Sequence, residues 1–326
     1  MKTTILVIAA VAAVIIIAAI VTGNYFINFG LARRKKKHTN EHLLGELPAR
    51  SDKSDASALN HQEARQEAEA WKHTVAQEKV KILSSDGLTL TGELFFPGKD
   101  AREGHKWVIL IHGYSGGKAE MKPFAMEYCR RGYMSLCIDC RGHGESEGAF
   151  IGMGYLDGKD VISWMNHIIS MDPEARIVLH GHSMGGVAVV TACGSNPPKE
   201  LKAAIADCPF SSSRRMFNKQ LKEWFRLPGF PIINVSELIF RVRGGYGFKD
   251  AEAIRFVHSI KTPILYIHGD EDKFVPTDMS RELYDATKAP KDIIIFHGAA
   301  HAQSQDTDPQ GYYKAVFDFI ESKGIE

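Results

Sequence analysis

The stretch Arg176–Gly186, which reads RIVLHGHSMGG, limits the possible folds of this chain more than any other. Its Ile177–Leu179 segment is an apolar run typical of a buried parallel strand. The pattern Gly-x-Ser-x-Gly follows, centred on Ser183, and helix-forming small and apolar residues continue to Cys193. A sharp strand-to-helix turn lifts a serine hydroxyl above a sheet edge, and glycines flank it because Cβ atoms would clash. The alternative is a glycine-rich turn with an incidental serine, so the rest of the chain must decide.

Apolar segments that favour strands alternate with helical segments along most of the chain. Strands are predicted at Val80–Leu83, Leu88–Phe96, Val108–Ile111, Tyr133–Ile138, Ile177–Leu179, Ala203–Asp207, Ile264–His268 and Ile293–Phe296. Helices are predicted at Lys118–Arg131, Tyr155–Ile169, Val187–Cys193 and Gln310–Ser322. This alternation predicts an α/β fold with a doubly wound, mostly parallel sheet. Such sheets bind ligands beyond the carboxyl ends of their strands.

The composition is that of a globular protein and excludes several function classes. The 326 residues are 44% hydrophobic and 24% charged, and the net charge of +1 argues against nucleic-acid binding. The C-x-x-C of Cys137 and Cys140 has no second pair to complete a zinc site. We therefore expect the five cysteines to be core residues, and neither a metal nor a cofactor is expected. Their odd number favours a reducing compartment.

The N-terminus carries a candidate membrane anchor. The run Ile5–Val21 is apolar without interruption, and about 20 such residues span a bilayer. The basic cluster Arg33–Lys37 follows it, so residues 1–37 are predicted to be an uncleaved anchor with a basic flank. A signal peptide cleaved near Val21–Gly23 is the alternative, although its basic n-region would be thin. The positive-inside rule places the following domain in the cytoplasm, and the extracellular side is the alternative.

Residues 38–77 are predicted to link this anchor to a globular domain, residues 78–326. The linker is polar, and its segment His61–Trp71 is rich in Glu, Gln and Ala, which favours a short helix. Trp71 gives that helix an apolar side chain with which it could dock on the domain.

A serine nucleophile needs a basic group, and that group needs an acid to orient it. Where serine occupies such a strand–helix turn, the chain order is nucleophile, acid, histidine. After Ser183, the predicted strand Ile264–His268 ends in an acidic loop. Asp270, Glu271 and Asp272 are the candidates for the acid.

The last predicted strand ends in a small-residue loop that holds a candidate base. His301 lies in this Gly/Ala loop, where an imidazole can reach over the sheet edge. His297 is the alternative, and it fits a strand-end residue better.

The oxyanion hole needs two backbone donors, for which we predict the N–H groups of Met184 and Tyr114. The side chain of His112 is expected to bond the backbone of its own loop.

A further glycine-rich loop, DCRGHGES, spans residues 139–146. Asp139 and His143 could contribute to a metal site, but no other ligands accompany them. We expect instead that Arg141 and Asp139 form a network that braces the loop.

In combination, these motifs resemble those of the α/β-hydrolase superfamily. The motifs are HGYSGG at 112–117, DCRGHGES at 139–146, GHSMGG at 181–186, HGDEDKFVP at 268–276 and GAAH at 298–301. The similarity covers residues 78–322, and it is nearest to bacterial membrane-anchored hydrolases of the serine aminopeptidase/monoacylglycerol-lipase-like group. The resemblance implies the α/β-hydrolase fold with a catalytic triad of Ser183, Asp272 and His301. It also implies a helical cap inserted between strands 6 and 7.

The predicted cap, residues 209–258, interrupts the strand–helix rhythm and is rich in aromatic residues. Most of its apolar side chains must pack against the sheet. A minority should line an apolar pocket over Ser183, and the substrate-binding candidates are Phe210, Phe217, Trp224 and Phe225. Such a pocket favours an acyl group over a sugar or a nucleotide. The cations Arg214, Arg215 and Lys219 are expected on a solvated helix face, with anion binding as the alternative.

The residues and the resemblance together predict a serine hydrolase that cleaves carboxylic esters of apolar acyl groups through an acyl-enzyme. A serine peptidase of the aminopeptidase type, a thioesterase or an acyltransferase could use the same groups. A catalytically silent, membrane-tethered binding protein is the non-enzyme alternative, which the complete set of candidate residues opposes. The expected partners are a small-molecule ester or acyl substrate and, through the N-terminal helix, a membrane.

Overall fold

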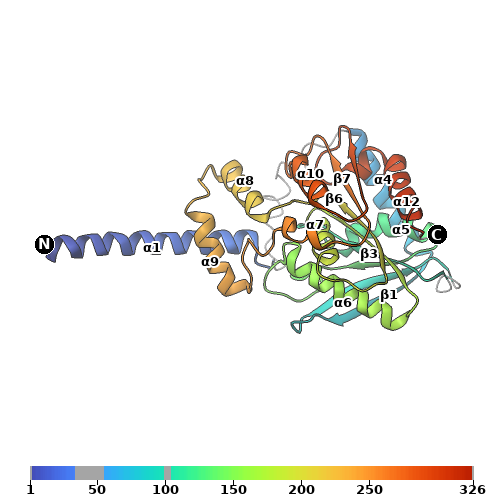
Figure 1. The fold of residues 1–326 in the computed structure, drawn as a ribbon, viewed down its shortest axis with the longest axis horizontal. Coiled ribbons are helices and arrows are strands. Elements are labelled where there is room, and N and C mark those ends of the chain that lie inside the picture. The colour runs from blue at the N-terminus through green and yellow to red at the C-terminus, as the bar shows by residue number, and fades with distance from the viewer. Residues whose placement is uncertain (1, 34–54, 99–103, 325–326) are drawn as a thin grey trace.

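A computed structural model describes residues 2–33, 55–98 and 104–324 of the chain (Figure 1). Most of the basic flank and the first part of the predicted linker, together residues 34–54, lie outside the described residues. The described residues form one large sheet with helices on both faces, and a long N-terminal helix projects from one end (Figure 1).

Eight strands form the sheet in the order β1-β2-β4-β3-β5-β6-β7-β8. They are β1 (Ala76–Leu83), β2 (Thr89–Phe96), β3 (Lys106–Ile111), β4 (Met134–Ile138), β5 (Arg176–His182), β6 (Leu201–Asp207), β7 (Ile264–Gly269) and β8 (Lys291–Phe296). Strand β2 runs antiparallel to both of its neighbours, β1 and β4, and the pairs from β4 to β8 are all parallel. This confirms the predicted α/β fold with a mostly parallel sheet.

The first strand is longer than its sequence pattern predicts. We expected it at Val80–Leu83, but it begins at Ala76. Its first four residues are exposed, so they carry no alternation of apolar and polar side chains. Pairing with β2, from Ala76 opposite Phe96 onward, holds these residues in the sheet instead.

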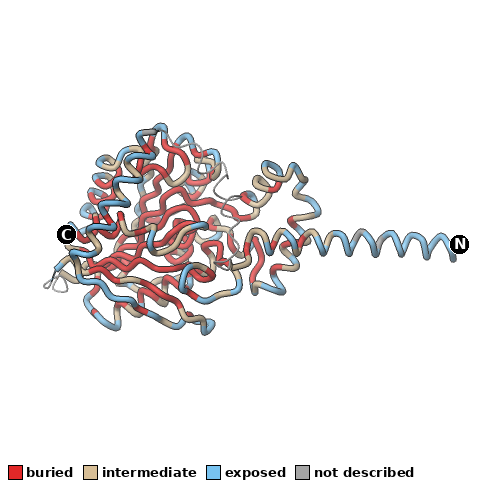
Figure 2. The backbone as a smooth tube through the Cα atoms, turned by 180° about the vertical axis from the view of Figure 1, so that it is seen from behind, coloured by how far each residue is buried: buried red, intermediate tan, exposed pale blue. Residues whose placement is uncertain are grey.

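Two apolar layers bury the two faces of the sheet. Trp107, Ile109 and Ile111 of β3 belong to one layer, while Val108 and Leu110 belong to the other, as strand alternation requires. The helices of the sheet domain are α5 (Lys122–Arg130), α6 (Tyr155–Met171), α7 (Met184–Cys193), α10 (Thr277–Ala286), α11 (Ser304–Thr307) and α12 (Pro309–Glu321). Side chains of α6, α7 and α10 pack in the first layer, and those of α5 and α12 pack in the second. Burial is therefore concentrated in the inner strands of the sheet (Figure 2).

A helix precedes the sheet, as expected, but it is longer than the predicted one. Helix α4 spans Asp55–Trp71 and contacts α5 and α11. Trp71 lies on Phe95 of β2 with ring centroids 5.2 Å apart. At the other end, Ser57 donates a hydrogen bond to the side-chain oxygen of Gln303. These contacts with the domain hold the added turns of the helix.

The cap lies between β6 and β7, where the resemblance places it. It contains α8 (Ser213–Phe225) and α9 (Ile232–Gly244). Both helices stand beside the C-terminal part of the N-terminal helix α1 (Lys2–Gly30), away from most of the sheet (Figure 1). By length and apolar composition, α1 could cross a membrane or serve as a signal sequence.

We predict that replacing a core leucine of β3 destabilises the fold far more than the same change on β1. Leu110 is fully buried, so Leu110→Ala should lower the free energy of unfolding by about 2–5 kcal/mol. Leu83 is 70% exposed, and Leu83→Ala should change it by less than about 0.5 kcal/mol. Urea unfolding of the detergent-solubilised full chain, followed by circular dichroism, measures both. Equal losses would contradict the described core.

Candidate active site

Ser183 occupies a strained turn between β5 and α7. Its backbone φ of 55° is unusual for a residue with a side chain. The Ser183 N–H donates to the carbonyl of Asp207 (2.8 Å), and its carbonyl accepts from the N–H of Val187 (3.0 Å). A Cβ on Gly185 would lie 2.1 Å from the carbonyl oxygen of Ile111, so this glycine is required by close packing. The turn therefore has the geometry predicted from the Gly-x-Ser-x-Gly pattern.

The structure brings the three candidate catalytic side chains into one hydrogen-bonded chain. The hydroxyl of Ser183 lies 2.9 Å from Nε2 of His301, and Nδ1 of His301 lies 2.6 Å from Oδ2 of Asp272. Asp272 follows β7 and His301 follows β8, so three strand ends contribute one residue each. All three side chains are largely buried. With Nδ1–H donating to the carboxylate, Nε2 is free to accept the serine proton.

Several donors hold Asp272 as a carboxylate. Its Oδ1 accepts the backbone N–H groups of Phe274 (2.9 Å) and Val275 (2.8 Å), and Nε2 of His268 lies 3.1 Å from its Oδ2. Burial alone would raise the pKa of Asp272, but the charge on His301 and hydrogen bonds from both histidines hold that pKa below its usual range. Asp272 is thus anionic at neutral pH and can orient His301.

His268 is a positioning residue that the sequence analysis did not assign. Its ring is completely buried at the end of β7, and Nδ1 lies 2.6 Å from the hydroxyl of Ser280. The same ring contacts Asp272 through Nε2. The available signal was its place at a strand end, four residues before the acid.

The competing candidates lie outside this chain of hydrogen bonds. Asp270 accepts from Nδ1 of His297 (2.7 Å) and from the N–H of Gly298 (2.8 Å). The side chain of His297 is 91% exposed, so these two competitors pair with each other at the surface. Glu271 is also exposed.

The loop after β3 packs directly against the nucleophile turn. A Cβ on Gly113 would lie 3.5 Å from that of Ser183, and the Gly113 N–H donates to Nε2 of His182 (3.2 Å). Tyr114 follows, and its backbone carbonyl lies 2.8 Å from Nε2 of His143. Met184 is the first residue of α7, where a helix leaves its N–H groups without partners inside the helix. The oxyanion roles of Tyr114 and Met184 remain predictions.

His112 braces this loop with its side chain, as expected. Nδ1 lies 2.6 Å from the carbonyl oxygen of Gly113, and Nε2 accepts the N–H of Cys140 (3.0 Å). One donor and one acceptor require a neutral ring, and burial lowers the pKa of His112 to about 3.

The 139–146 loop is braced as predicted, but through two separate sets of partners. Arg141 forms paired hydrogen bonds with the carboxylates of Asp86 and Asp160, at 2.6–3.0 Å. Asp139 accepts from the backbone N–H of Lys118 (2.8 Å) and bonds its ammonium group. Arg141 and Asp139 both brace the loop, as expected, but each has its own partners, because the guanidinium fork is held by the two carboxylates of Asp86 and Asp160.

A metal ion does not explain the catalytic cluster. Among the described residues, one group with metal-ligand spacing stands out, formed by Cys208, Asp272 and His301. Asp272 and His301 already share a short hydrogen bond, and burial keeps the pKa of the Cys208 thiol well above its usual range. A neutral thiol is a poor ligand. All five cysteines are buried and free, as expected for core residues.

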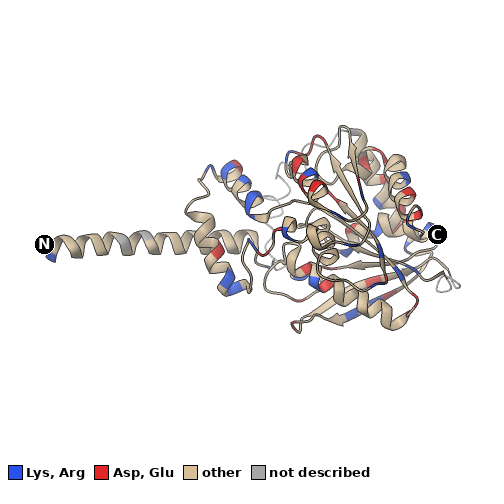
Figure 3. Ribbon diagram, viewed as in Figure 1, with Lys and Arg blue, Asp and Glu red and all other residues tan. Residues whose placement is uncertain are grey.

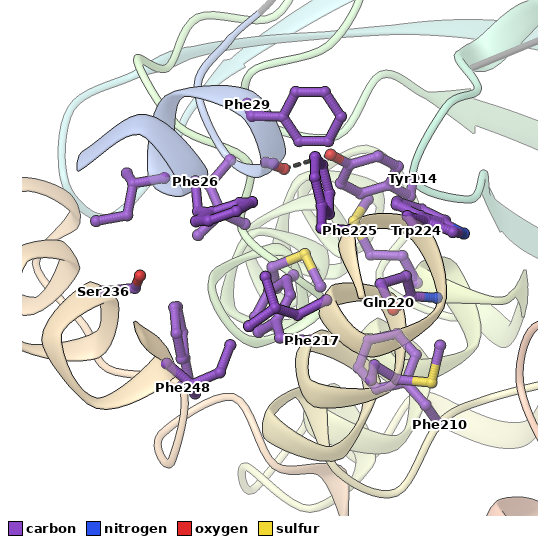
Figure 4. A pocket seen from close by; sticks show the side chains of 18 of the residues that line it. Phe26, Phe29, Tyr114, Phe210, Phe217, Gln220, Trp224, Phe225, Ser236 and Phe248 are labelled. Carbon is purple, nitrogen blue, oxygen red and sulfur yellow. Dashed lines mark hydrogen bonds between the residues drawn. The ribbon is translucent and has the colours of Figure 1, made fainter. Parts of the chain in front are cut away.

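An apolar pocket lies over Ser183, between the cap and the end of α1 (Figure 4). Its walls include all four predicted substrate-binding residues, namely Phe210, Phe217, Trp224 and Phe225, together with Tyr114, Met153, Met184, Met216, Gln220, Leu221, Ile233, Ser236, Phe248 and Phe274. Its remaining wall comes from Phe26, Ile27, Phe29, Gly30 and Leu31. The sequence analysis missed this last group, because an unbroken apolar run predicts a membrane span but no packing partner.

Of the three cap cations, Arg215 is exposed, as expected for a solvated helix face, whereas Arg214 and Lys219 are half-buried. Arg214 pairs with Glu237, and Arg215 pairs with Glu282. Lys219 pairs with Glu223 and bonds the carbonyl of Lys273. Figure 3 shows Lys and Arg residues on both cap helices, α8 and α9.

Two family sequence models match this chain. One, described as Serine aminopeptidase, S33, matches residues 102–239. The other, described as Serine hydrolase (FSH1), matches residues 177–305, a range that contains Ser183, Asp272 and His301.

Individual relatives agree with these matches. The chain is 26% identical to the uncharacterized protein YqkD of Bacillus subtilis over 66% of this chain and 71% of that protein. It is 25% identical to the acylamino-acid-releasing enzyme of Rattus norvegicus, over 64% of this chain and 30% of that enzyme. Among solved structures, the Pyrococcus furiosus esterase Pf2001 superposes with a TM-score of 0.63 and 25% identity, covering 77% of this chain and 92% of the esterase.

We predict that the turn at Ser183 tolerates no side chain at residue 185. Gly185→Ala would push Cβ into a backbone carbonyl and should lower the free energy of unfolding by about 3 kcal/mol or more. Gly98 has open space around it, so Gly98→Ala is the control and should change stability by less than about 0.5 kcal/mol. Urea unfolding of the full chain measures both. A neutral Gly185→Ala would contradict the close approach of the turn to β3.

Proposed function

This chain belongs to the α/β-hydrolase superfamily and to its serine hydrolases, and we propose that it cleaves carboxylic esters of apolar acyl groups. The observation that carries the proposal is the hydrogen-bonded series Ser183–His301–Asp272 on the wall of an apolar pocket. A serine with an oriented imidazole is an acyl-transfer nucleophile, and the pocket gives the acyl group an apolar site.

In this mechanism, Nε2 of His301 takes the proton of Ser183 as its oxygen attacks the ester carbonyl carbon. The N–H groups of Met184 and Tyr114 stabilise the tetrahedral oxyanion, each by about 3 kcal/mol in the transition state. His301 then gives the proton to the departing alcohol, which leaves an acyl group on Ser183. A water molecule, deprotonated by His301, releases the acid. Asp272 holds the imidazole in the required tautomer and stabilises its cation.

The lining of the pocket favours an ester over a peptide with a free amino terminus. An aminopeptidase has to hold an ammonium group, and a buried ammonium needs a carboxylate partner. The described residues that line the pocket include no carboxylate, and their polar side-chain groups come from Tyr114, Ser183, Gln220, Trp224 and Ser236. Thioester cleavage would use the same residues and the same pocket. A silent binding protein would have no need of the oriented His301.

We predict that a fluorophosphonate probe labels the full chain at Ser183. Ser183→Ala should abolish both labelling and hydrolysis of p-nitrophenyl butanoate, because the nucleophilic oxygen is lost. Ser195→Ala is the control, since its hydroxyl bonds the Thr191 carbonyl at the far end of α7, and it should label normally. In-gel fluorescence and absorbance measure the two effects.

Labelling that persists in Ser183→Ala would overturn the assignment of the nucleophile. Absence of labelling in a folded wild-type chain would overturn the hydrolase itself. Faster cleavage of the matched butanoyl p-nitroanilide than of the ester would favour the peptidase instead.

A second prediction separates the two aspartates of the acidic loop. Asp272→Asn should lower kcat on p-nitrophenyl butanoate by on the order of 10⁴-fold, because an amide no longer fixes the productive tautomer of His301. Asp270→Asn should leave kcat within about twofold, since that carboxylate pairs with an exposed histidine. Steady-state kinetics in detergent decide between them. The reverse pattern would transfer the acid role to Asp270.

A further inference from the structure

The end of the N-terminal helix is part of the pocket that holds Ser183. Phe26 and Phe29 of α1 both pack edge-on against Phe225 of the cap, with ring centroids 4.9 and 5.5 Å apart. Gly30 and Tyr114 line the pocket too, and the Tyr114 hydroxyl donates to the Gly30 carbonyl (Figure 4). Residues of α1 therefore bound the same space as the nucleophile.

Contacts along one face of α1 fix this wall in place. A Cβ on Gly23 would lie 3.1 Å from side-chain carbons of Val235 and Ile239, so α1 and α9 meet closely there. The Ser236 hydroxyl donates to the Gly23 carbonyl (3.4 Å), and Arg243 donates to the Asn28 side chain (2.9 Å). Cleavage at Val21–Gly23 would cut the helix where it enters this packing, so the structure favours the uncleaved anchor.

The part of α1 before Gly23 has the dimensions of a membrane span. It is apolar from Ile5 to Val21, and most of its described side chains are exposed. At 1.5 Å per residue, the segment from Lys2 to Thr22 is about 30 Å long, the thickness of a hydrocarbon core. If this segment spans the bilayer, Gly23 lies at the membrane surface. The cap helix α9, which packs on Gly23, then lies at the same surface.

The cap presents apolar side chains suited to that surface. Phe230, Leu238 and Val242 are 77%, 66% and 82% exposed. Val242 lies between two exposed cations, Arg241 and Arg243. Apolar side chains beside arginines are the composition of a protein surface at the boundary between acyl chains and phosphate headgroups.

We propose that the substrate is an acyl ester resident in the bilayer, whose acyl chain enters the pocket between α1 and the cap directly from the adjoining leaflet. This inference rests on the proposed esterase function and identifies its substrate class as a lipid. The occupant of the exposed cap surface is the membrane that holds α1. Phe26 and Phe29, which form one wall of the pocket, belong to the same helix whose N-terminal part is surrounded by lipid. The acyl chain of the substrate therefore moves from one apolar environment to another without crossing water.

The test compares two esters with one leaving group, using the full chain in phosphatidylcholine vesicles. p-Nitrophenyl palmitate partitions into the bilayer, whereas p-nitrophenyl butanoate dissolves in water. The wild-type chain should hydrolyse the palmitate faster at equal total concentration. A preference for the butanoate would overturn the inference and leave the proposed function standing.

Two leucines of similar exposure provide a matched pair for the membrane contact. Leu238→Asp should lower the ratio of palmitate to butanoate hydrolysis about tenfold. Burying a carboxylate among acyl chains is unfavourable, so the substitution should move the cap away from the bilayer surface. Leu83→Asp, on β1 and outside the cap, should leave the ratio unchanged. An unchanged ratio in Leu238→Asp would overturn the contact with the bilayer.

Two neighbouring aromatic residues of α1 test the pocket wall. Phe26→Ala should raise KM for the palmitate about tenfold through lost contact with the acyl chain. Tyr25 is exposed and does not line the pocket, so Tyr25→Ala should leave this KM unchanged. Equal effects of the two would overturn the role of α1 as a wall. Fluorophosphonate labelling of Ser183 confirms that each variant is folded. Absence of labelling in the wild-type chain would instead count against the proposed function itself.

Discussion

The candidate active site depends on the close approach of the Ser183 turn to β3 and β6, the strands on either side of β5. Gly181 pairs with Ile111 of β3 and with Ala206 of β6, so the three strands end level with one another. The Ser183 N–H reaches the Asp207 carbonyl, while Gly185 leaves room for the Ile111 carbonyl. The strained φ of Ser183 is therefore imposed by its neighbours rather than by the turn alone. The same register sets the loop after β3 against the serine.

The acid and the base meet by the same kind of strand pairing. Gly269 at the end of β7 pairs with Phe296 at the end of β8, and the Glu271 N–H donates to the Ala299 carbonyl 3.1 Å away. The backbones of the two loops are thus joined by a hydrogen bond just before the two candidate catalytic residues, Asp272 and His301. Asp272 turns inward toward His301 and His268, and Asp270 turns outward toward His297. Two aspartates two residues apart consequently occupy opposite environments.

Most of the fold, and the identity of the candidate nucleophile and base, could be predicted from the sequence because apolar strands and glycine turns are local signals. The choice of the candidate acid could not be made from such local signals. Asp270, Glu271 and Asp272 all follow a buried strand, and only the turn of the backbone separates them, so Asp272 rested on the family resemblance. The first residues of β1 and the first turns of α4 show no periodic pattern of apolar residues in the sequence. Contacts with other parts of the structure, rather than an amphipathic face, hold them in place.

The contribution of α1 to the pocket wall was the feature that the sequence predicted least. An apolar run indicates that a segment is removed from water, but it does not indicate what the segment packs against. The residue types along α1 nevertheless change at the point where the helix begins to pack against the cap. Its run Ile5–Val21 is uniformly apolar, whereas Gly23, Asn24 and Asn28 occur where the helix meets the cap. A small residue with two amides suits close packing with Ser236 and Arg243. Tyr114 then connects this helix to the predicted oxyanion loop, because its hydroxyl bonds the Gly30 carbonyl while the residue before it, Gly113, lies against Ser183. Under the proposed mechanism, the anchor therefore shapes both the binding of the acyl chain and the position of the group that stabilises the oxyanion.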